Sequence, residues 1–367
     1  MALSPLFRKI SFDDVPGWRQ DDPAAAFAAF RRSAFRSLEK PYRTGALGVE
    51  AQAFADAFAE ARSISDLALA AARDFFERHF VPCEVKPQDR ERGFVTGFYE
   101  PVVEASAARI HHFRFPLLAR PADLVDLDET NRPAGLDPYF AFGRATRDGI
   151  VEYHDRRAIE EGALAGQGLE IAWLADAVDA FFIHVQGAAR LAMTDGTRKR
   201  VTYAAKSGHP FTGPGGVLAE LGEVPLADVT MQSIRRWFGD NPRRNDEILW
   251  RNRSYIFFRE ASVDDDGLGP IAAAKVPLTP GRSIAVDRLL HTFGTPFFIH
   301  APTLKAFGSD GFTRLMIAQD TGSAITGPAR ADLFAGSGSD AGEIAGVVRH
   351  PADFIALLPR PLLAGGR

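Results

Sequence analysis

The alternation of helix-like and strand-like stretches is the feature of this sequence that most constrains its fold. Residues 22–81 are rich in Ala, Phe, Arg and Glu, with apolar residues at helical steps, which predicts amphipathic helices. Short apolar runs between Pro, Gly and Asn/Asp turns predict strands over residues 93–203, helices return over residues 215–250, and the remainder is again strand-rich. We therefore expect the two ends of the chain to form one domain, with a β domain inserted between them.

Length and composition indicate a globular protein of two domains. The chain has 367 residues, of which 46% are hydrophobic and 25% are charged, so neither disorder nor a membrane-spanning bundle is expected. The net charge is −4 and no basic run is longer than Arg198-Lys199-Arg200, which argues against nucleic acid as a partner. Cys83 is the single cysteine and the nine histidines are scattered, so we expect no disulfide, no metal site and no cofactor.

A short apolar run that ends in an acid points to a functional site. Residues 312–319 have the length and flanks of a buried strand, and Asp320 follows where the strand enters the turn Thr321-Gly322-Ser323. Glycine at such a turn lets a ligand approach backbone N–H groups. Asp332 and Asp340 follow beside further glycines, so neighbouring carboxylates should perturb the pKa of Asp320. The alternative is ordinary turn chemistry, in which Asp320 caps its own backbone.

The tetrapeptide Asp320-Thr321-Gly322-Ser323 also matches the active-site sequence of aspartic proteases. That chemistry needs two aspartates that share one proton. The rest of the chain contains no second Asp-Thr-Gly or Asp-Ser-Gly, and 367 residues are far too many for a retroviral-type subunit. A protease is therefore not favoured.

Three segments in the middle of the chain carry further structural predictions. Residues 94–103 alternate aromatic and β-branched residues and should form a strand that a glycine interrupts. The apolar run at residues 181–187 is interpreted as another strand. Asp195-Gly196 predicts a hairpin turn, with residues 198–203 as its return strand.

A set of motifs, taken in order, resembles the MltA-type membrane-bound lytic murein transglycosylases. In the first part of the chain the motifs are Thr96-Gly97-Phe98-Tyr99-Glu100-Pro101, His184-Val185-Gln186-Gly187, Tyr203-Ala204-Ala205-Lys206-Ser207-Gly208-His209 and Met231-Gln232-Ser233-Ile234-Arg235. Near the C-terminus they are Lys275-Val276-Pro277-Leu278, Ala285-Val286-Asp287, Gly294-Thr295 and Asp320-Thr321-Gly322-Ser323-Ala324-Ile325 with Asp332. The second set is similar to that family's three-aspartate domain, whose aspartates match Asp287, Asp320 and Asp332. The family usually has two glycines where Gly322-Ser323 stands here.

The resemblance implies a mainly β fold with some helix. It implies a double-psi β-barrel domain formed by residues 1–102 plus 251–367, which also carries the N-terminal helices. Residues 103–250 would form an inserted second β-barrel domain that completes a glycan groove.

The resemblance also implies an activity. The family cleaves the β-1,4 bond between N-acetylmuramic acid and N-acetylglucosamine in peptidoglycan without water, and leaves 1,6-anhydromuramoyl ends. Its single catalytic acid matches Asp320. The implied partner is the glycan strand of peptidoglycan, and the implied location is the periplasm or cell envelope of a Gram-negative bacterium, with membrane association through a leader. Residues 1–18 contain neither a long apolar stretch nor an early Cys, and the implied substrate lies outside the inner membrane, so we expect an export leader or an upstream start outside this sequence.

Single-acid chemistry fits this reaction physically. Glycosidases use two carboxylates because a water must be activated, whereas attack by the sugar's own 6-hydroxyl lets one group give and then recover a proton. Asp320 must begin protonated, and burial with the like charges of Asp332 and Asp340 should raise its pKa. Asp332 and Asp340 could instead orient sugar hydroxyls or cap turns, and for Asp287 we expect structural support rather than catalysis. A hydrolase that uses Asp320 with Asp332 or Asp340, and a peptidoglycan-binding protein without catalysis, stay open as alternatives.

Substrate contacts are expected from several motif residues. Phe98 and Tyr99 could stack on sugar faces, with core packing as the alternative for Phe98. Gln186 and Lys206 could bind acetamido or lactyl groups. The remaining expected substrate-binding residues are Thr96, Gly187, Gly322 and Ser323.

Overall fold

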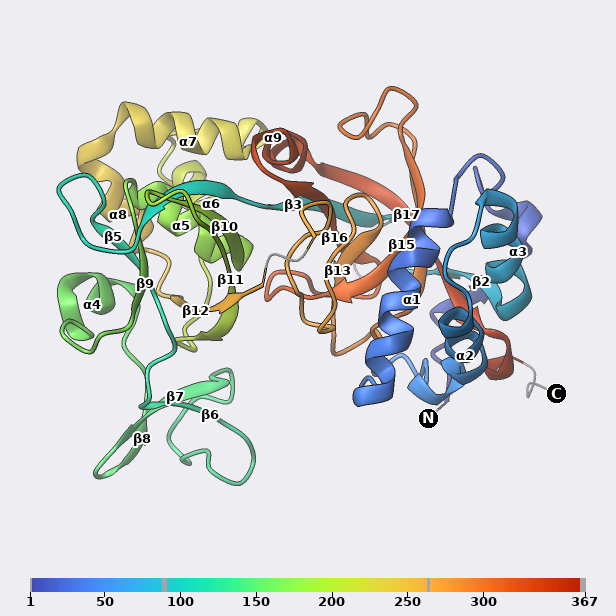
Figure 1. Cartoon of the computed structure of the whole chain (residues 1–367), viewed down its shortest axis with the longest axis horizontal. Helices are drawn as coiled ribbons and strands as arrows, with labels where there is room; N and C mark the ends of the chain where they lie inside the picture. Colours follow the sequence, from blue (N-terminus) through green and yellow to red (C-terminus); the bar gives the residue numbers. More distant parts are fainter. Residues whose placement is uncertain (1, 88–90, 263–264, 364–367) are drawn as a thin grey trace. The chain divides into compact units, whose positions relative to one another are not determined.

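The structure is a computed structural model that describes residues 2–87, 91–262 and 265–363 (Figure 1). The chain divides into two compact units. The first combines Met1–Tyr99 with Asp265–Arg367, and the second is Glu100–Asp264. Both ends of the chain therefore belong to one unit, which the middle of the sequence interrupts.

An eight-stranded mixed sheet forms the centre of the first unit, as far as the structure describes it. Its strand order is β1-β2-β17-β14-β15-β13-β16-β3. Its strands are β1 (Phe7–Lys9), β2 (Phe80–Val85), β3 (Gly93–Glu100), β13 (Ser283–Val286), β14 (Pro296–Ala301), β15 (Phe312–Asp320), β16 (Arg330–Ser337) and β17 (Arg349–Pro359). Because β17 also pairs with β3, the pairings lead from β17 through β14, β15, β13, β16 and β3 back to β17.

Strand β15 confirms the apolar run expected before Asp320. Its residues Leu315–Gln319 are all buried, as expected for a strand with neighbours on both edges. It pairs antiparallel with β14 and parallel with β13. The strand that delivers Asp320 is thus held from both sides.

Helices cover the sheet of the first unit and confirm the helical prediction for residues 22–81. These helices are α1 (Ala24–Glu39), α2 (Ala55–Ser63) and α3 (Leu69–His79), and α9 (Ser339–Val347) follows β16. Phe27, Phe30 and Phe75 lie fully buried, with edge-on ring contacts between Phe27 and Phe75. These phenylalanines therefore form core, whereas Phe35 of α1 is exposed.

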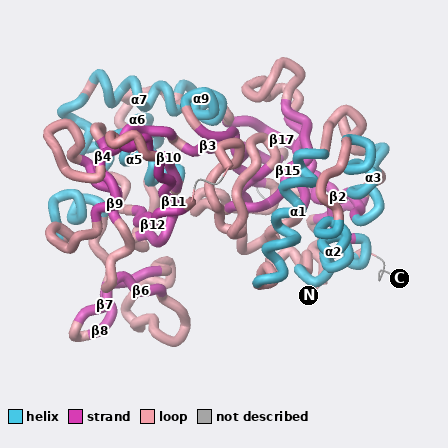
Figure 2. The backbone as a smooth tube through the Cα atoms, viewed as in Figure 1, coloured by secondary structure: helices cyan, strands magenta, loops and turns pink. Residues whose placement is uncertain are grey.

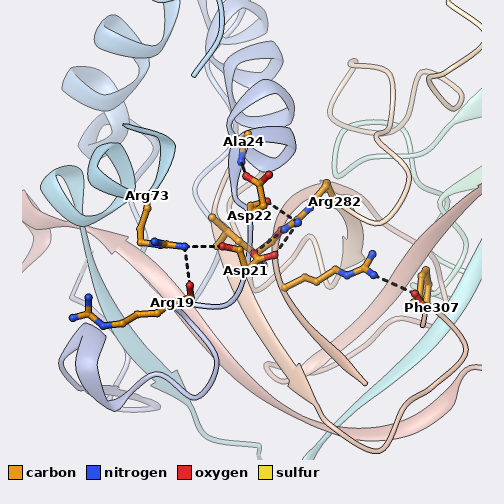
Figure 3. Close-up of polar contacts among 9 residues, drawn as sticks. Arg19, Asp21, Asp22, Ala24, Arg73, Arg282 and Phe307 are labelled. Atoms are coloured by element: carbon orange, nitrogen blue, oxygen red, sulfur yellow. Dashed lines mark hydrogen bonds and ion pairs between the residues drawn. The ribbon is translucent and has the colours of Figure 1, made fainter. Parts of the chain in front are cut away.

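A buried ion pair joins the two chain segments that make up the first unit (Figure 3). The guanidinium of Arg282 donates from Nη1 and Nη2 to the two carboxylate oxygens of Asp21, both at 2.8 Å. Arg282 also donates to the carbonyl of Asp22 at 2.7 Å, while Leu315 N–H on β15 donates to Asp21 at 2.8 Å. Arg73 on α3 donates to the Asp21 carbonyl at 2.9 Å. Asp21 thereby ties the start of α1, the approach to β13, and β15 together.

The second unit contains a six-stranded and a three-stranded sheet among its described residues (Figure 2). The first has the order β12-β11-β10-β4-β9-β5 and the second the order β6-β7-β8. The strands are β4 (Val102–Ser106), β5 (Phe115–Leu118), β6 (Leu124–Asp126), β7 (Phe142–Thr146), β8 (Gly149–Val151), β9 (Glu170–Leu174), β10 (Ala188–Met193), β11 (Arg198–Lys206) and β12 (Ile256–Ala261). The β10–β11 hairpin turns at Asp195-Gly196, as predicted, and Gly196 has a φ of 84°.

The helices of this unit confirm one prediction and correct another. The expected helices of residues 215–250 are α6 (Pro214–Glu220), α7 (Met231–Asp240) and α8 (Asn245–Leu249), and a short α4 (Arg156–Ala158) precedes them. Residues 181–187, however, do not form a strand but lie in and just after helix α5 (Ala177–Gln186). The Asp176 carboxylate caps the first turn by accepting from Val178 and Asp179 N–H, and Gly187 ends the helix at a φ of 75°. Asp176 and Gly187 are the sequence signals that indicate a helix here, whereas the apolar run alone is compatible with a strand.

The observed division differs from the expected domain boundaries by three residues at the start of the second unit and by fourteen at its end. The expected boundaries followed residues 102 and 250, whereas the second unit begins at Glu100 and continues to Asp264. Strand β12 explains the difference, because it pairs antiparallel with β11 inside the second unit. None of the helices in the described ranges has the length and apolar composition that a bilayer crossing requires.

Replacing Asp21 with Ala should destabilise the first unit by roughly 3–5 kcal/mol, because Arg282 would remain buried without its counter-charge. Equilibrium urea denaturation measures the change, and hydrogen exchange of the β13 and β15 amides locates it. The matched control is Asp13→Ala, which removes the exposed Asp13–Arg19 pair and should change stability little. Equal effects of the two substitutions would contradict the role assigned to Asp21.

Candidate active site

Asp320 is the last residue of β15, and a neighbouring loop closes over its carboxylate. The loop at residues 270–278 donates Ala273 N–H to Asp320 Oδ1 at 3.1 Å. Ala274 N–H in the same loop donates to the Gln319 carbonyl at 2.9 Å. Within this loop Lys275 has a φ of 62°, the left-handed value that a non-glycine residue adopts only at a cost, and is alone in this among the non-glycine residues described. The loop is therefore fixed against the strand end that carries the acid.

Burial makes Asp320 a carboxyl group that can hold a proton near neutral pH. Loss of solvent raises its pKa to about 6, and the negative charge of Asp332 adds to the rise. Hydrogen bonds from the backbone N–H groups of Thr321 and Ala273 and the positive charge of Lys275 oppose it. The balance leaves a group that can both donate and accept a proton between about pH 5 and 7.

Asp332 lies across β13 from Asp320. In the sheet register Ala285 of β13 is opposite Asp320 on one side and opposite Asp332 on the other. At the usual strand spacing the two aspartate backbones are then roughly 10 Å apart. Burial raises the pKa of Asp332, while the charge of Arg330 and a hydrogen bond from Thr96 Oγ1 oppose the rise. The two acids are close enough to interact through their charges without sharing a hydrogen bond.

Asp287 holds the turn that follows Asp320. Its carboxylate accepts from Leu289 N–H at 3.0 Å and from Gly327 N–H at 2.9 Å. Buried His291 supports the same turn, since its Nε2 donates to the Pro328 carbonyl at 2.8 Å. Burial lowers the pKa of His291 to about 4, so this histidine stays neutral. These contacts agree with a supporting role for Asp287.

Gly322 and Ser323 are exposed at the tip of that turn, next to the acid. Ile325 N–H donates to the Gly322 carbonyl at 3.0 Å, which closes a tight turn with the Ile325 side chain buried beneath it. The turn thus presents small residues and backbone to solvent beside Asp320, as the sequence predicted.

Asp340 does not have the expected effect on the pKa of Asp320. It is exposed in the first turn of α9, where its carboxylate accepts from the Ser339 hydroxyl at 3.3 Å. Among the described residues, the charges that act on Asp320 are those of Asp332 and Lys275, and Asp340 adds no resolved contribution. An exposed carboxylate is screened by water, which explains the absence.

Phe98 and Tyr99 are core residues and do not offer a face to a sugar. The Phe98 ring packs on Phe334, with ring centroids 5.2 Å apart, and the Tyr99 ring lies against Gly342 of α9. Both side chains are less than 10% exposed. A Cβ at Gly97 would lie 2.8 Å from the Cα of Ala345, so glycine is needed where α9 crosses β3. The expected stacking role is therefore corrected to core packing.

The other expected substrate-binding residues are divided between the two units. Thr96 is on β3 in the first unit, where its hydroxyl is engaged with Asp332 and Arg330. In the second unit Gln186 is the last residue of α5 and Gly187 follows it. Lys206 ends β11, with its Nζ 5.6 Å from the centre of the Tyr139 ring.

Buried Gln319 is a site residue that sequence reasoning missed. Its side-chain oxygen accepts from Ser283 Oγ at 2.6 Å, and its amide donates to the Ala29 carbonyl and to Ser33 Oγ. These bonds connect α1 and β13 to the residue just before Asp320. A polar residue at the end of an otherwise apolar strand was the available signal, but its partners on α1 lie 290 and 286 residues away in sequence.

Two domain descriptions and several relatives match this chain. Residues 94–259 match the MltA specific insert domain, and residues 282–358 match the 3D domain. Membrane-bound lytic murein transglycosylase A of Escherichia coli strain K12 is 30% identical over 262 residues. That match covers 70% of this chain and 62% of the relative, so the chain aligns with less than two thirds of that curated relative's length.

Two solved structures are similar over almost the whole of both chains. A membrane-bound lytic murein transglycosylase from Agrobacterium tumefaciens is 53% identical with a TM-score of 0.91, and the match covers 97% of this chain and 98% of that one. MltA from Neisseria gonorrhoeae is 32% identical with a TM-score of 0.78, over 98% of this chain and 93% of that one. On sequence, domain order and fold, the chain belongs to the MltA family of lytic murein transglycosylases.

Proposed function

We propose that this chain is a lytic transglycosylase that cleaves the β-1,4 bond between N-acetylmuramic acid and N-acetylglucosamine in peptidoglycan. The observation that carries the proposal is the half-buried carboxyl of Asp320 at the end of β15, whose pKa of about 6 lets it start the reaction protonated. The names of the similar proteins, which are murein transglycosylases, support the same reaction.

The reaction needs one proton to travel out and one to return. Asp320 donates its proton to the leaving glycosidic oxygen as the bond to the muramoyl C1 breaks. The 6-hydroxyl of the same sugar then bonds to C1 and gives its proton to the Asp320 carboxylate. No water is consumed, the product carries a 1,6-anhydro ring, and Asp320 is again protonated. Attack within one sugar supplies the proximity that a second carboxylate supplies in hydrolases.

We assign the remaining site residues by their surroundings. The exposed Gly322-Ser323 turn leaves room for a sugar beside Asp320. Asp332 acts by its charge, and Asp287 holds the turn through Gly327. Gln186 and Lys206, with Gly187 between helix and strand, bind acetamido or lactyl groups of the glycan.

The finer fold assignment is also part of this proposal. We assign the ring of pairings through β17, β14, β15, β13, β16 and β3 to a double-psi β-barrel. In the second unit an isolated bridge between Ala119 and Phe258 links the β5 and β12 edges of the six-stranded sheet, which supports a second barrel. The domain boundaries then follow the two compact units.

Peptidoglycan as substrate places the site of action in the cell envelope. The name of the Escherichia coli relative, a membrane-bound murein transglycosylase, supports that location. Fractionation of cells that express the full-length native protein tests it, and recovery only in the cytosol would count against the proposal.

Asp320→Asn should abolish turnover on purified sacculi, by more than the roughly 10²–10⁴-fold often assigned to general acid–base catalysis, because both proton transfers depend on this residue. Glycan binding should survive. Mass spectrometry of the wild-type products should show 1,6-anhydromuramoyl ends, lighter than hydrolytic ends by one water molecule. Reducing ends that carry solvent oxygen, together with an equally inactive Asp332→Asn variant, would identify a two-carboxylate hydrolase. Binding without any soluble product would identify a non-catalytic protein.

Asp332→Asn should retain activity but shift its pH profile. Wild-type turnover should fall as pH rises through about 6, since the proton that starts the reaction is then lost. Removing the like charge of Asp332 lowers the pKa of Asp320, so the alkaline limb should move to lower pH. The matched control is the exposed Asp340→Asn, which should leave the limb in place. Movement in the control alone would reverse the assignment of the two acids.

A further inference from the structure

An arginine and a threonine clamp the acid that neighbours Asp320. Arg330 Nη2 donates to Thr96 Oγ1 at 2.7 Å, and Thr96 Oγ1 donates to Asp332 Oδ1. Arg330 and Asp332 are on β16, and Thr96 is on β3, the next strand of the sheet. The three side chains form a short relay across two neighbouring strands.

The direction of the hydrogen bonds in this relay is fixed by chemistry. A guanidinium has only donors, so the Thr96 oxygen must accept from Arg330. The single hydroxyl proton of Thr96 is then left for Asp332, which must accept it. A carboxylate that accepts is favoured in its ionised form. The relay therefore selects the charged state of Asp332.

Arg330 is itself held in place. Its Nη1 donates to the Ala331 carbonyl, and its guanidinium lies over the Phe94 ring, 5.6 Å from the ring centre. Its positive charge counteracts the effect of burial on Asp332. The fixed positive charge of Arg330 and the oriented hydroxyl of Thr96 therefore both act on the Asp332 carboxylate, which is half-buried.

Other ionisable groups on the elements around this relay have different partners or lie exposed. The β17 residue opposite Thr96 is Arg349, which is exposed, and His350 beside it contacts Thr303. Glu100, the last residue of β3, pairs with Arg200. On α9 Asp340 and Glu343 are exposed, and Lys275 in the 270–278 loop acts on Asp320.

We propose that Arg330 and Thr96 are positioning residues that keep Asp332 ionised and aimed, so that its fixed negative charge holds the starting proton on Asp320. The inference rests on the proposed function, because it explains how Asp320, the acid of that reaction, keeps its starting proton. Neither residue touches the reacting atoms in this scheme. Without Arg330, half-buried Asp332 would take up a proton itself, and Asp320 would lose the like charge that keeps it protonated.

A carbon-13 NMR titration of aspartate-labelled protein tests the clamp without substrate. The Asp320 carboxyl signal is assigned by its loss in Asp320→Asn. Arg330→Met should lower the titration midpoint of Asp320 by about 0.5–1 pH unit, the size expected for one like charge at this distance. Asp332→Asn should lower it equally, and the double variant should show no further change, because Arg330 acts through Asp332.

Thr96 supplies a second, milder test, and Arg92 a control. Thr96→Val removes the hydroxyl at constant shape and should shift the midpoint in the same direction by less, while Thr96→Ser should restore it. Arg92→Met removes an exposed bidentate pair with Asp353 in the same unit and should leave the midpoint unchanged.

Two outcomes would overturn the clamp. One is an unchanged midpoint in both Arg330→Met and Thr96→Val. The other is a shift by Arg330→Met that persists in the Asp332→Asn background, which would show that Arg330 acts on Asp320 directly. Product analysis on sacculi decides the proposed function separately, so a chain that makes no anhydro ends could still show the clamp.

Discussion

The buried pair between Asp21 and Arg282 is the contact on which the first unit depends. It links two segments that are 261 residues apart and, through Leu315 N–H, fixes β15 against the approach to β13. Register matters here, because a one-residue slip of β15 would turn every side chain of the strand to the other face. Asp320 would then leave its place opposite Ala285. A buried pair of this kind contributes little net free energy compared with apolar packing, but breaking it is costly, so its value is in specifying one arrangement.

The same unit sets the chemical character of Asp320 by withholding solvent. Gln319 anchors the strand end to α1 and β13, and the 270–278 loop covers the carboxylate, so ionisation occurs in a poorly hydrated place. A group whose folded pKa is raised lowers stability as pH rises from its ordinary value of 3.8 through about 6, where the folded protein must give up the proton. The raised pKa of Asp320 therefore lowers stability at neutral pH.

Sequence reasoning succeeded where the signal was local and failed where it depended on distant partners. The apolar run before Asp320 and the Asp195-Gly196 hairpin follow from period and turn chemistry, and the structure contains both. The apolar residues of 181–187 fit strand and helix equally, and the Asp176 cap decides for the helix. Phe98 and Tyr99 were expected to stack on sugars. Their side chains are instead buried against β16 and α9, which lie more than 230 residues further along the sequence. The motif order, in contrast, pointed to the family without any knowledge of contacts.

The interrupted first unit has a consequence for how the chain is made. The second unit, Glu100–Asp264, is continuous and can fold as soon as it leaves the ribosome. Strand β17 (Arg349–Pro359) follows the second unit in the sequence and pairs with β2, β14 and β3, so these three strands gain that partner only after residue 359 has been synthesised. Until the C-terminal segment has been synthesised, α1 lacks β15, the strand on which it packs. The continuous second unit is therefore complete in sequence before the first unit, which needs residues from both sides of it.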